Sequence, residues 1–308
     1  MNNKTRKGIN SSVYTEEIEV SLSRCYNINM KITILGSGGW EGTPSPFCND
    51  KPCAAAIKNP TSKDFRTRPE ILVENDKGKF LIEISPDIRV QAARHGLTDI
   101  SDFLISHWHF DHLYGILELG AWSQFIKNGD ITIYCSTGTR GWIEKNFQHI
   151  PKKVQQVQPY VPFELKGIWV IPFAVYHMYN QDNNLPEEEL DNAFGFLLEK
   201  EQKKIAYLGD YYKLPKKSIE LIQNCDAIIA DGTRLFENTY PDSTLHSGIK
   251  ADRDHLSGDA IFPFVKSLHA KKIIFHSITH LPNKLHEEMK AMMPQGMEIS
   301  YDEMSIEL

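Results

Sequence analysis

The chain has 308 residues, of which 41% are hydrophobic and 24% are charged. This composition is typical of a globular protein and excludes a mostly disordered chain. The formal net charge of −6 argues against a broad electrostatic surface for nucleic acid.

Cysteine content and hydropathy indicate the compartment. The five cysteines are odd in number and scattered along the chain, so we expect no disulfide framework. No run approaches the roughly 20 apolar residues that a membrane helix needs. The basic first seven residues are not followed by the apolar segment of a secretory signal. We therefore expect a cytoplasmic protein with no membrane partner.

In chain order, residues 1–29 are polar and aperiodic, and we predict a flexible extension ahead of one folded domain, residues 30–308. Short β-branched runs bounded by turn residues predict strands. These runs are residues 30–35, 70–74, 79–84, 102–106, 131–135, 168–176, 194–199, 204–208, 227–230 and 272–275. Helices are predicted at residues 87–95, 113–127, 216–225, 255–269 and 285–293. This mixture suits an α/β fold of two facing sheets with helices outside.

Two loops are distinctive. The Gly-rich segment 36–42 follows the first strand but lacks the Gly-Lys-Ser/Thr of a phosphate-binding P-loop, so we predict a tight turn that lines a cleft. The polar, acidic stretch 180–192 is predicted to be a surface insertion or lid.

The decisive segment is Ser-His-Trp-His-Phe-Asp-His at residues 106–112, directly after the apolar strand end Phe103-Leu104-Ile105. Imidazole nitrogens and carboxylate oxygens suit divalent ions such as Zn²⁺ or Mn²⁺. His107 and His109 can converge on one ion, while Asp111 and His112 can turn toward a second. Structural zinc sites favour cysteine, so a His-rich site containing Asp favours a catalytic metal centre.

The His-x-His-x-Asp-His pattern after a hydrophobic strand resembles the signature of the metallo-β-lactamase superfamily. The resemblance implies an αββα four-layer sandwich with two divalent metal ions, zinc or manganese, in the cleft between the sheets. It implies that one ion is bound by His107, His109 and His177, and the other by Asp111, His112 and His280, with Asp210 bridging. His276 competes with His280 for the last role, and we prefer His280.

Within this superfamily the chain is similar to PhnP-type cyclic phosphodiesterases from about residue 30 to the end. The supports are segments 35–38, 85–89, 255–257 and 301–302. That branch carries an extra structural zinc on a Cys-x-Cys-x-x-Cys run and a distant His. Here Asp50 replaces the middle cysteine between Cys48 and Cys53, and Asn283 matches the distant His, so we expect no tight zinc there. Glu83 also stands where the family usually has Asp.

The resemblance implies a phosphodiesterase that cleaves a small or cyclic phosphate ester with a hydroxide bridging two metal ions. Asp111 and Asp210 would be catalytic carboxylates, and His255 the proton donor, flanked by Asp252 and Asp254. Arg89, Arg234 and Lys250 are candidates for binding a second anionic group.

Other readings remain open. They are a nuclease of the tRNA 3′-processing type, a lactone, ester or β-lactam hydrolase, and a non-catalytic metal-binding accessory protein on the same scaffold. A small phosphorylated molecule is the expected partner, and a homodimer is left open.

Overall fold

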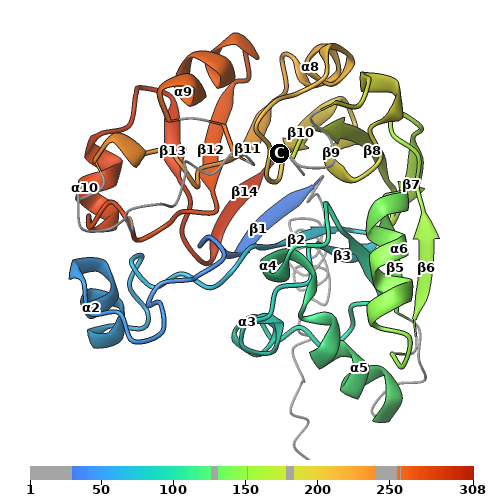
Figure 1. Ribbon diagram of the computed structural model, residues 1–308, viewed down its shortest axis with the longest axis horizontal. Coiled ribbons are helices and arrows are strands. Elements are labelled where there is room, and N and C mark those ends of the chain that lie inside the picture. The colour runs from blue at the N-terminus through green and yellow to red at the C-terminus, as the bar shows by residue number, and fades with distance from the viewer. Residues whose placement is uncertain (1–29, 126–130, 151, 178–183, 240–254, 257) are drawn as a thin grey trace, which may run out of the picture.

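The computed structural model describes residues 30–125, 131–150, 152–177, 184–239, 255–256 and 258–308. The predicted extension 1–29 lies outside the described residues, as does the first part of the predicted insertion 180–192. The strands of the described residues form two seven-stranded sheets that face each other (Figure 1).

The first sheet has the order β14-β1-β2-β3-β4-β5-β6. Its strands are β1 (Lys31–Gly36), β2 (Glu70–Asn75), β3 (Gly78–Ile82), β4 (Asp102–Leu104), β5 (Thr132–Cys135), β6 (Lys153–Gln156) and β14 (Met304–Glu307). Strands β3 to β6 are parallel, whereas β14, β1, β2 and β3 pair antiparallel. The carboxyl ends of β3, β4 and β5 therefore share one edge of the sheet.

The second sheet has the order β13-β12-β11-β10-β9-β8-β7. Its strands are β7 (Phe163–Leu165), β8 (Ile168–Val175), β9 (Ala193–Lys200), β10 (Lys203–Tyr207), β11 (Ala227–Asp231), β12 (Lys272–His276) and β13 (Met297–Ile299). Strands β10 to β13 run parallel. Side chains that follow β10, β11 and β12 consequently meet at one edge, which is where ligands bind in α/β sheets.

Alternation along the strands builds the layers. Ile71 and Val73 of β2 face the second sheet in the central core, whereas Leu72 faces outward. In β11, Ala227 and Ile229 face the central core, whereas Ile228 faces outward. Successive strand residues point to opposite faces, so strands that are apolar on both faces need a cover on each side.

Helices supply the outer covers. On the first sheet they are α3 (Ile88–Arg94), α4 (Phe110–Leu113), α5 (Ile116–Phe125) and α6 (Thr137–Asn146). On the second sheet they are α8 (Lys216–Ile222), α9 (Gly258–Ser267) and α10 (His286–Ala291). Figure 1 shows these two groups on opposite sides of the paired sheets, with α2 (Lys51–Lys58) set apart at the rim. The short 3-10 turns are η1 (Glu187–Glu189) and η2 (Glu237–Thr239).

The predicted αββα sandwich is confirmed, but several elements were missed. Helices α2 and α6 and strands β6, β7, β13 and β14 were not predicted. Most are short or polar: β6 reads Lys-Val-Gln-Gln, and its pattern resembles a loop. The predicted helix 113–127 corresponds to α5, which begins at Ile116, and residues 126–127 lie outside the described residues. Helix α4 precedes it and shares only Leu113 with the prediction. Among the helices of the described part, none combines the length and apolar character needed to cross a bilayer.

Candidate metal centre and active site

Six of the predicted site residues come together in the cleft at the strand ends. His107 follows β4, and His109 is the N-cap of α4, which itself carries Asp111 and His112. His177 follows β8 and Asp210 follows β10. Each is a buried residue except His109, which is half-buried. Both sheets therefore contribute to one site, as the sequence predicted for these six residues.

The first group contains His107, His109, His177 and Asp210. One ligand atom from each residue lies within 4.8 Å of those of the others. His109 Nδ1 is 3.0 Å from His177 Nε2. Asp210 Oδ2 lies 3.9 Å from Nε2 of both His107 and His177. Three imidazoles and a carboxylate that converge in this way form a ligand set suited to a first-row divalent ion.

The second group contains Asp111, His112 and, again, Asp210. His112 Nε2 lies 3.2 Å from Asp111 Oδ2 and 3.3 Å from Asp210 Oδ2. Asp210 therefore belongs to both groups and lies between them, in the position that the sequence assigned to a bridging ligand. Gly209, with a φ of +62°, allows the turn that points Asp210 into the cleft.

Two polar atoms of this site lack hydrogen-bond partners among the described residues. His107 Nε2 and Asp210 Oδ1 are buried and make no hydrogen bond to the described residues. Burial and the neighbouring imidazoles hold the pKa of His107 well below its usual value, so its ring is neutral, the form that binds metals. A buried, unsatisfied nitrogen and oxygen are costly unless a further group pairs with them. The residues therefore fit a bound divalent metal.

Glu83 contacts the ring of His112 on the side away from Asp111 and Asp210. Its carboxylate is fully buried and accepts hydrogen bonds from Tyr207 Oη (3.0 Å) and Ser106 N (3.2 Å). Its Oε1 also lies 3.2 Å from His112 Nδ1, which leaves Nε2 of that ring facing Asp111 and Asp210. Burial lowers the pKa of His112, but Asp111, Asp210 and Glu83 raise it more, and the net pKa lies well above its usual value. Glu83 thus orients a candidate ligand, as carboxylates behind metal-binding histidines do.

His255 lies beside the metal groups, but its carboxylate partner is one that the sequence did not indicate. Its Nδ1 is 2.6 Å from Oδ2 of Asp231, the last residue of β11, and its Nε2 is 3.9 Å from Asp210 Oδ2. Burial raises the pKa of Asp231, but the charge and the hydrogen bond of His255 lower it by more. The net pKa therefore lies below its usual value, and Asp231 stays ionised. The predicted partners Asp252 and Asp254 lie outside the described residues. The sequence signal that could have indicated Asp231 was its position at the end of a predicted strand, like that of Asp210 after the preceding strand.

The assignment of His280 is corrected by the structure. His280 Nδ1 lies 2.5 Å from Asp50 Oδ2 and 3.9 Å from Cys48 Sγ, in a group separate from the one around Asp210. The rejected alternative, His276, is the last residue of β12 and pairs with Asp231 across the sheet. Its Nε2 lies 2.9 Å from Gly36 O, and its ring packs 5.9 Å from that of Tyr207. The strand end reaches the cleft, whereas four residues later the chain has turned toward α2.

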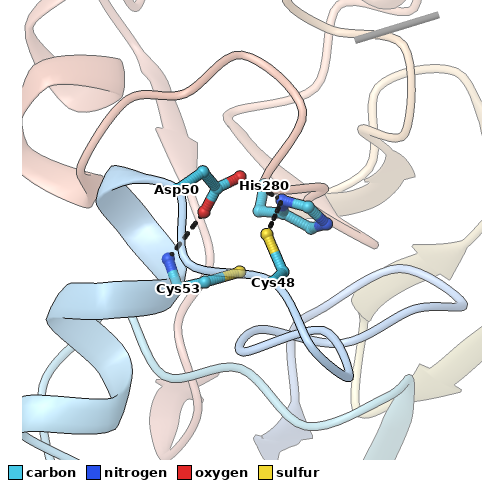
Figure 2. A group of neighbouring side chains, drawn as sticks. All are labelled: Cys48, Asp50, Cys53 and His280. Carbon is cyan, nitrogen blue, oxygen red and sulfur yellow. Dashed lines mark hydrogen bonds and ion pairs between the residues drawn. The ribbon is translucent and has the colours of Figure 1, made fainter.

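Figure 2 shows a second cluster formed by Cys48, Asp50, Cys53 and His280. The four ligand atoms lie within 4.8 Å of one another. Asp50 also caps α2, since its Oδ1 accepts from Cys53 N at 2.9 Å. Two thiols, an imidazole and a carboxylate supply the four ligands that a closed tetrahedral zinc site needs, with a carboxylate in a position that structural sites usually fill with Cys or His.

This cluster contradicts the premise from which we expected no tight zinc there. That expectation used Asn283 as the distant ligand, but Asn283 Oδ1 accepts from Lys51 N at 3.0 Å and is not one of the four. His280 takes the distant position, and the carboxylate of Asp50 takes the position of the missing thiol. The set is complete in number, with one oxygen ligand in place of sulfur.

The proposed anion-binding residues are dispersed. Arg89 lies on α3 and lines a separate, largely apolar cavity with Trp122 and Phe125, so it does not reach the metal centre. Arg234 lies near the site, with its Nη1 3.4 Å from His255 O and its Nε paired with Glu237. Lys250 lies outside the described residues.

A cavity of about 390 Å³ opens directly onto the candidate centre. Its size falls within the usual range for small-molecule sites. The lining residues are Trp40, His109, Phe110, Asp111, Asp210, Thr233 and His255.

The fold and this site define a metallo-β-lactamase-type protein. The family model described as the beta-lactamase superfamily domain matches residues 79–276, and the chain belongs to that superfamily, whose members are mostly hydrolases. The similarity to the PhnP branch is also confirmed. A crystal structure of a diphosphatase from the PhnP family superimposes with a TM-score of 0.73 at 26% identity, covering 91% of this chain and 97% of that one.

Other relatives carry different names. The structure of Zn²⁺-bound PqqB from Methylobacterium extorquens has a TM-score of 0.74 at 22% identity, covering 90% of this chain and all of that one. An octanoyltransferase of Porphyromonas gingivalis is 24% identical over 89% of this chain, which spans half the length of that protein. These names describe different functions, so the similarity establishes the superfamily and not one activity.

Proposed function

We propose that the protein is a metal-dependent phosphodiesterase that hydrolyses a small phosphate ester or diphosphate. The observation that carries this proposal is the position of Asp210. This single carboxylate belongs to both metal-ligand groups and also to the group formed with Asp231 and His255. The PhnP-family diphosphatase among the similar structures supports phosphoryl chemistry.

The metal ligands follow from the geometry. We assign one ion to His107, His109 and His177, and a second to Asp111 and His112, with Asp210 shared. His276 replaces His280 as the candidate for completing the second set. Burial lowers the pKa of His276 to about 4, so its imidazole is neutral, and its Nε2 would have to leave Gly36 O, 2.9 Å away, to bind an ion. Two divalent ions held in this way would supply Lewis-acid charge and lower the pKa of bound water.

The protein residues position the substrate and move a proton. His255 faces the cavity that holds the substrate, and Asp231 fixes its ring through Nδ1. A protonated His255 can donate from Nε2 to the oxygen that leaves phosphorus, which needs a proton to depart as an alcohol. Asp111 and Asp210 line the same cavity, where they would hold the ions that attract the phosphate.

The test uses protein loaded with Zn²⁺ or Mn²⁺, assayed on bis-(p-nitrophenyl) phosphate, a lactone, a β-lactam and a precursor tRNA. We expect turnover of the phosphodiester. Asp210→Ala should abolish it. His255→Gln should lower kcat about 100-fold or more on a diester whose leaving group is an alcohol, and less on bis-(p-nitrophenyl) phosphate, because nitrophenolate departs without a proton. The exposed His149 provides a matched control, because His149→Gln should leave the rate unchanged.

Other outcomes would replace this function. Faster turnover of the lactone or β-lactam would favour a carbonyl hydrolase, and trimming of the tRNA would favour a nuclease. Full metal loading without turnover of any substrate would favour an accessory protein.

A further inference from the structure

The Gly-rich turn after β1 places an exposed aromatic side chain at the mouth of the cavity. Gly42 N donates to Gly39 O at 3.0 Å, which closes a turn with Trp40 and Glu41 at its tip. Trp40 is 68% exposed, yet it lines the same cavity as Asp111 and Asp210. This arrangement accords with the cleft-lining turn that the sequence predicted.

The turn is held in place from two sides. Gly39 N donates to Ile278 O at 3.2 Å, and Glu41 is hydrogen-bonded to Thr279 through their side chains. Arg68 Nε donates to Trp40 O at 2.9 Å, while its Nη1 pairs with Asp87 at 2.9 Å. These hydrogen bonds fix the backbone at Trp40, although most of its indole is exposed to solvent.

A second aromatic ring lines the same opening. Phe110, at the start of α4, is 44% exposed and also lines the cavity. The guanidinium of Arg68 lies 5.4 Å from the centre of the Phe110 ring, so the residue that braces Trp40 also contacts Phe110. One arginine thus links the two aromatic residues beside a site whose inner end consists of carboxylates and imidazoles.

We propose that Trp40 and Phe110 form a stacking subsite for a flat heteroaromatic ring, so that the substrate is a nucleotide-type phosphate ester or diphosphate. This inference rests on the proposed function for the phosphate end of the ligand. Aromatic side chains offer π-faces to bases, and each base stacked in this way strengthens binding substantially. The cavity of about 390 Å³ lies within the usual range for small-molecule sites.

The experiment compares binding of AMP and ribose 5-phosphate to the metal-loaded protein by calorimetry. The two probes share the sugar and phosphate and differ in the base. We expect AMP to bind about tenfold or more tightly than ribose 5-phosphate. Trp40→Ala should remove most of this preference, and Trp40→Phe should retain most of it. Trp169→Ala is the matched control and should leave the preference unchanged. Trp169 is 51% exposed on β8 and is not among the residues lining this cavity.

Three results would overturn the subsite: equal affinity for the two probes, no binding of either, or equal weakening of both by Trp40→Ala. Failure of the phosphodiesterase assay has a different signature. If phosphodiesters are not cleaved but the base preference still depends on Trp40, the proposed function is wrong and the subsite stands. If phosphodiesters are cleaved without a base preference, only the subsite is wrong.

Discussion

Asp231 is the residue that gives His255 a defined orientation. Its carboxylate is buried, accepts from Thr233 N at 2.8 Å and lies 2.6 Å from His255 Nδ1. Because a ring held at Nδ1 presents Nε2 to the cavity, the pair resembles other carboxylate–histidine couples that set a tautomer. No local sequence pattern connects residues 231 and 255, since only the packing of β11 beside the cavity joins them.

Replacing Asp231 tests this positioning role. Asp231→Asn should lower kcat about 10- to 100-fold, because the imidazole loses the carboxylate that orients it. The alkaline limb of the kcat–pH profile should move to lower pH, because loss of a nearby negative charge favours the neutral ring. Metal content, measured by atomic emission, should not change. A uniform drop in rate with an unshifted profile would contradict the assignment.

His280 provides a second test at single-residue scale. If the cluster in Figure 2 holds zinc, His280→Ala should lower the metal content by one ion per chain and reduce thermal stability, while some turnover remains. Were His280 a ligand of the catalytic centre, the same substitution would abolish turnover. Asn283→Ala is the matched control and should keep the full metal content.

At the scale of elements, α4 positions Asp111 and His112 through close contact with the loop after β3. Ile84 N donates to His112 O at 2.8 Å, and Gly115 N donates to Ile84 O at 3.0 Å. A Cβ on Gly115 would lie 2.0 Å from Ser85 O, so no other residue fits without moving α4. The close packing of this helix therefore fixes the second metal-ligand group.

Gly115→Ala should consequently displace α4. We expect a loss of about 1–3 kcal/mol in the free energy of unfolding, together with weaker metal binding. Gly141 within α6 is the control, because a Cβ there would meet nothing within 4 Å. Gly141→Ala should be neutral or stabilise the protein by about 0.5–1 kcal/mol, as helix propensity predicts. Chemical denaturation of both variants decides the matter, and equal stability losses would contradict this account.

At the scale of the whole molecule, a buried hydrogen-bond network joins the segment before β2 to residues 286–300. Arg66 is buried and donates to Ser300 O at 2.6 Å and to His286 Nδ1 at 2.9 Å. Burial, and then the charges of Arg66, Lys63 and Lys290, lower the pKa of His286 to about 3. The folded protein therefore keeps this histidine neutral, whereas the unfolded chain protonates it below a pH of about 6.5.

The sign of the pH effect follows from this difference. As pH falls from about 6.5 toward 3, the unfolded state takes up a proton that the folded state does not, so stability decreases. One such proton costs at most about 1.4 kcal/mol per pH unit. His286→Asn, which retains an acceptor for Arg66, should reduce the slope of urea-unfolding stability between pH 6.5 and 4. His149→Asn, at an exposed position, should leave that slope unchanged. Equal slopes in the two variants would contradict the prediction.

Local sequence was sufficient for those features that lie within one segment. The residues of 106–112 converge because a strand end and the first turn of a helix hold them a few residues apart. The structure groups His107 with His109 and Asp111 with His112, as the sequence predicted. The short β-branched runs at β2 and β11 likewise predicted strands of two facing sheets with helices outside, and the pleat decides which of their residues share a side.

Tertiary structure decided the features that depend on where distant segments end. Sequence offered both His276 and His280, and the three residues between them carry the chain from the edge of β12 to the cluster at α2. It likewise could not connect Asp231 with His255, or Asp50 with His280. Each pair lies within hydrogen-bond distance because separate strand ends and loops meet across the sandwich, and spacing along the chain does not encode that meeting.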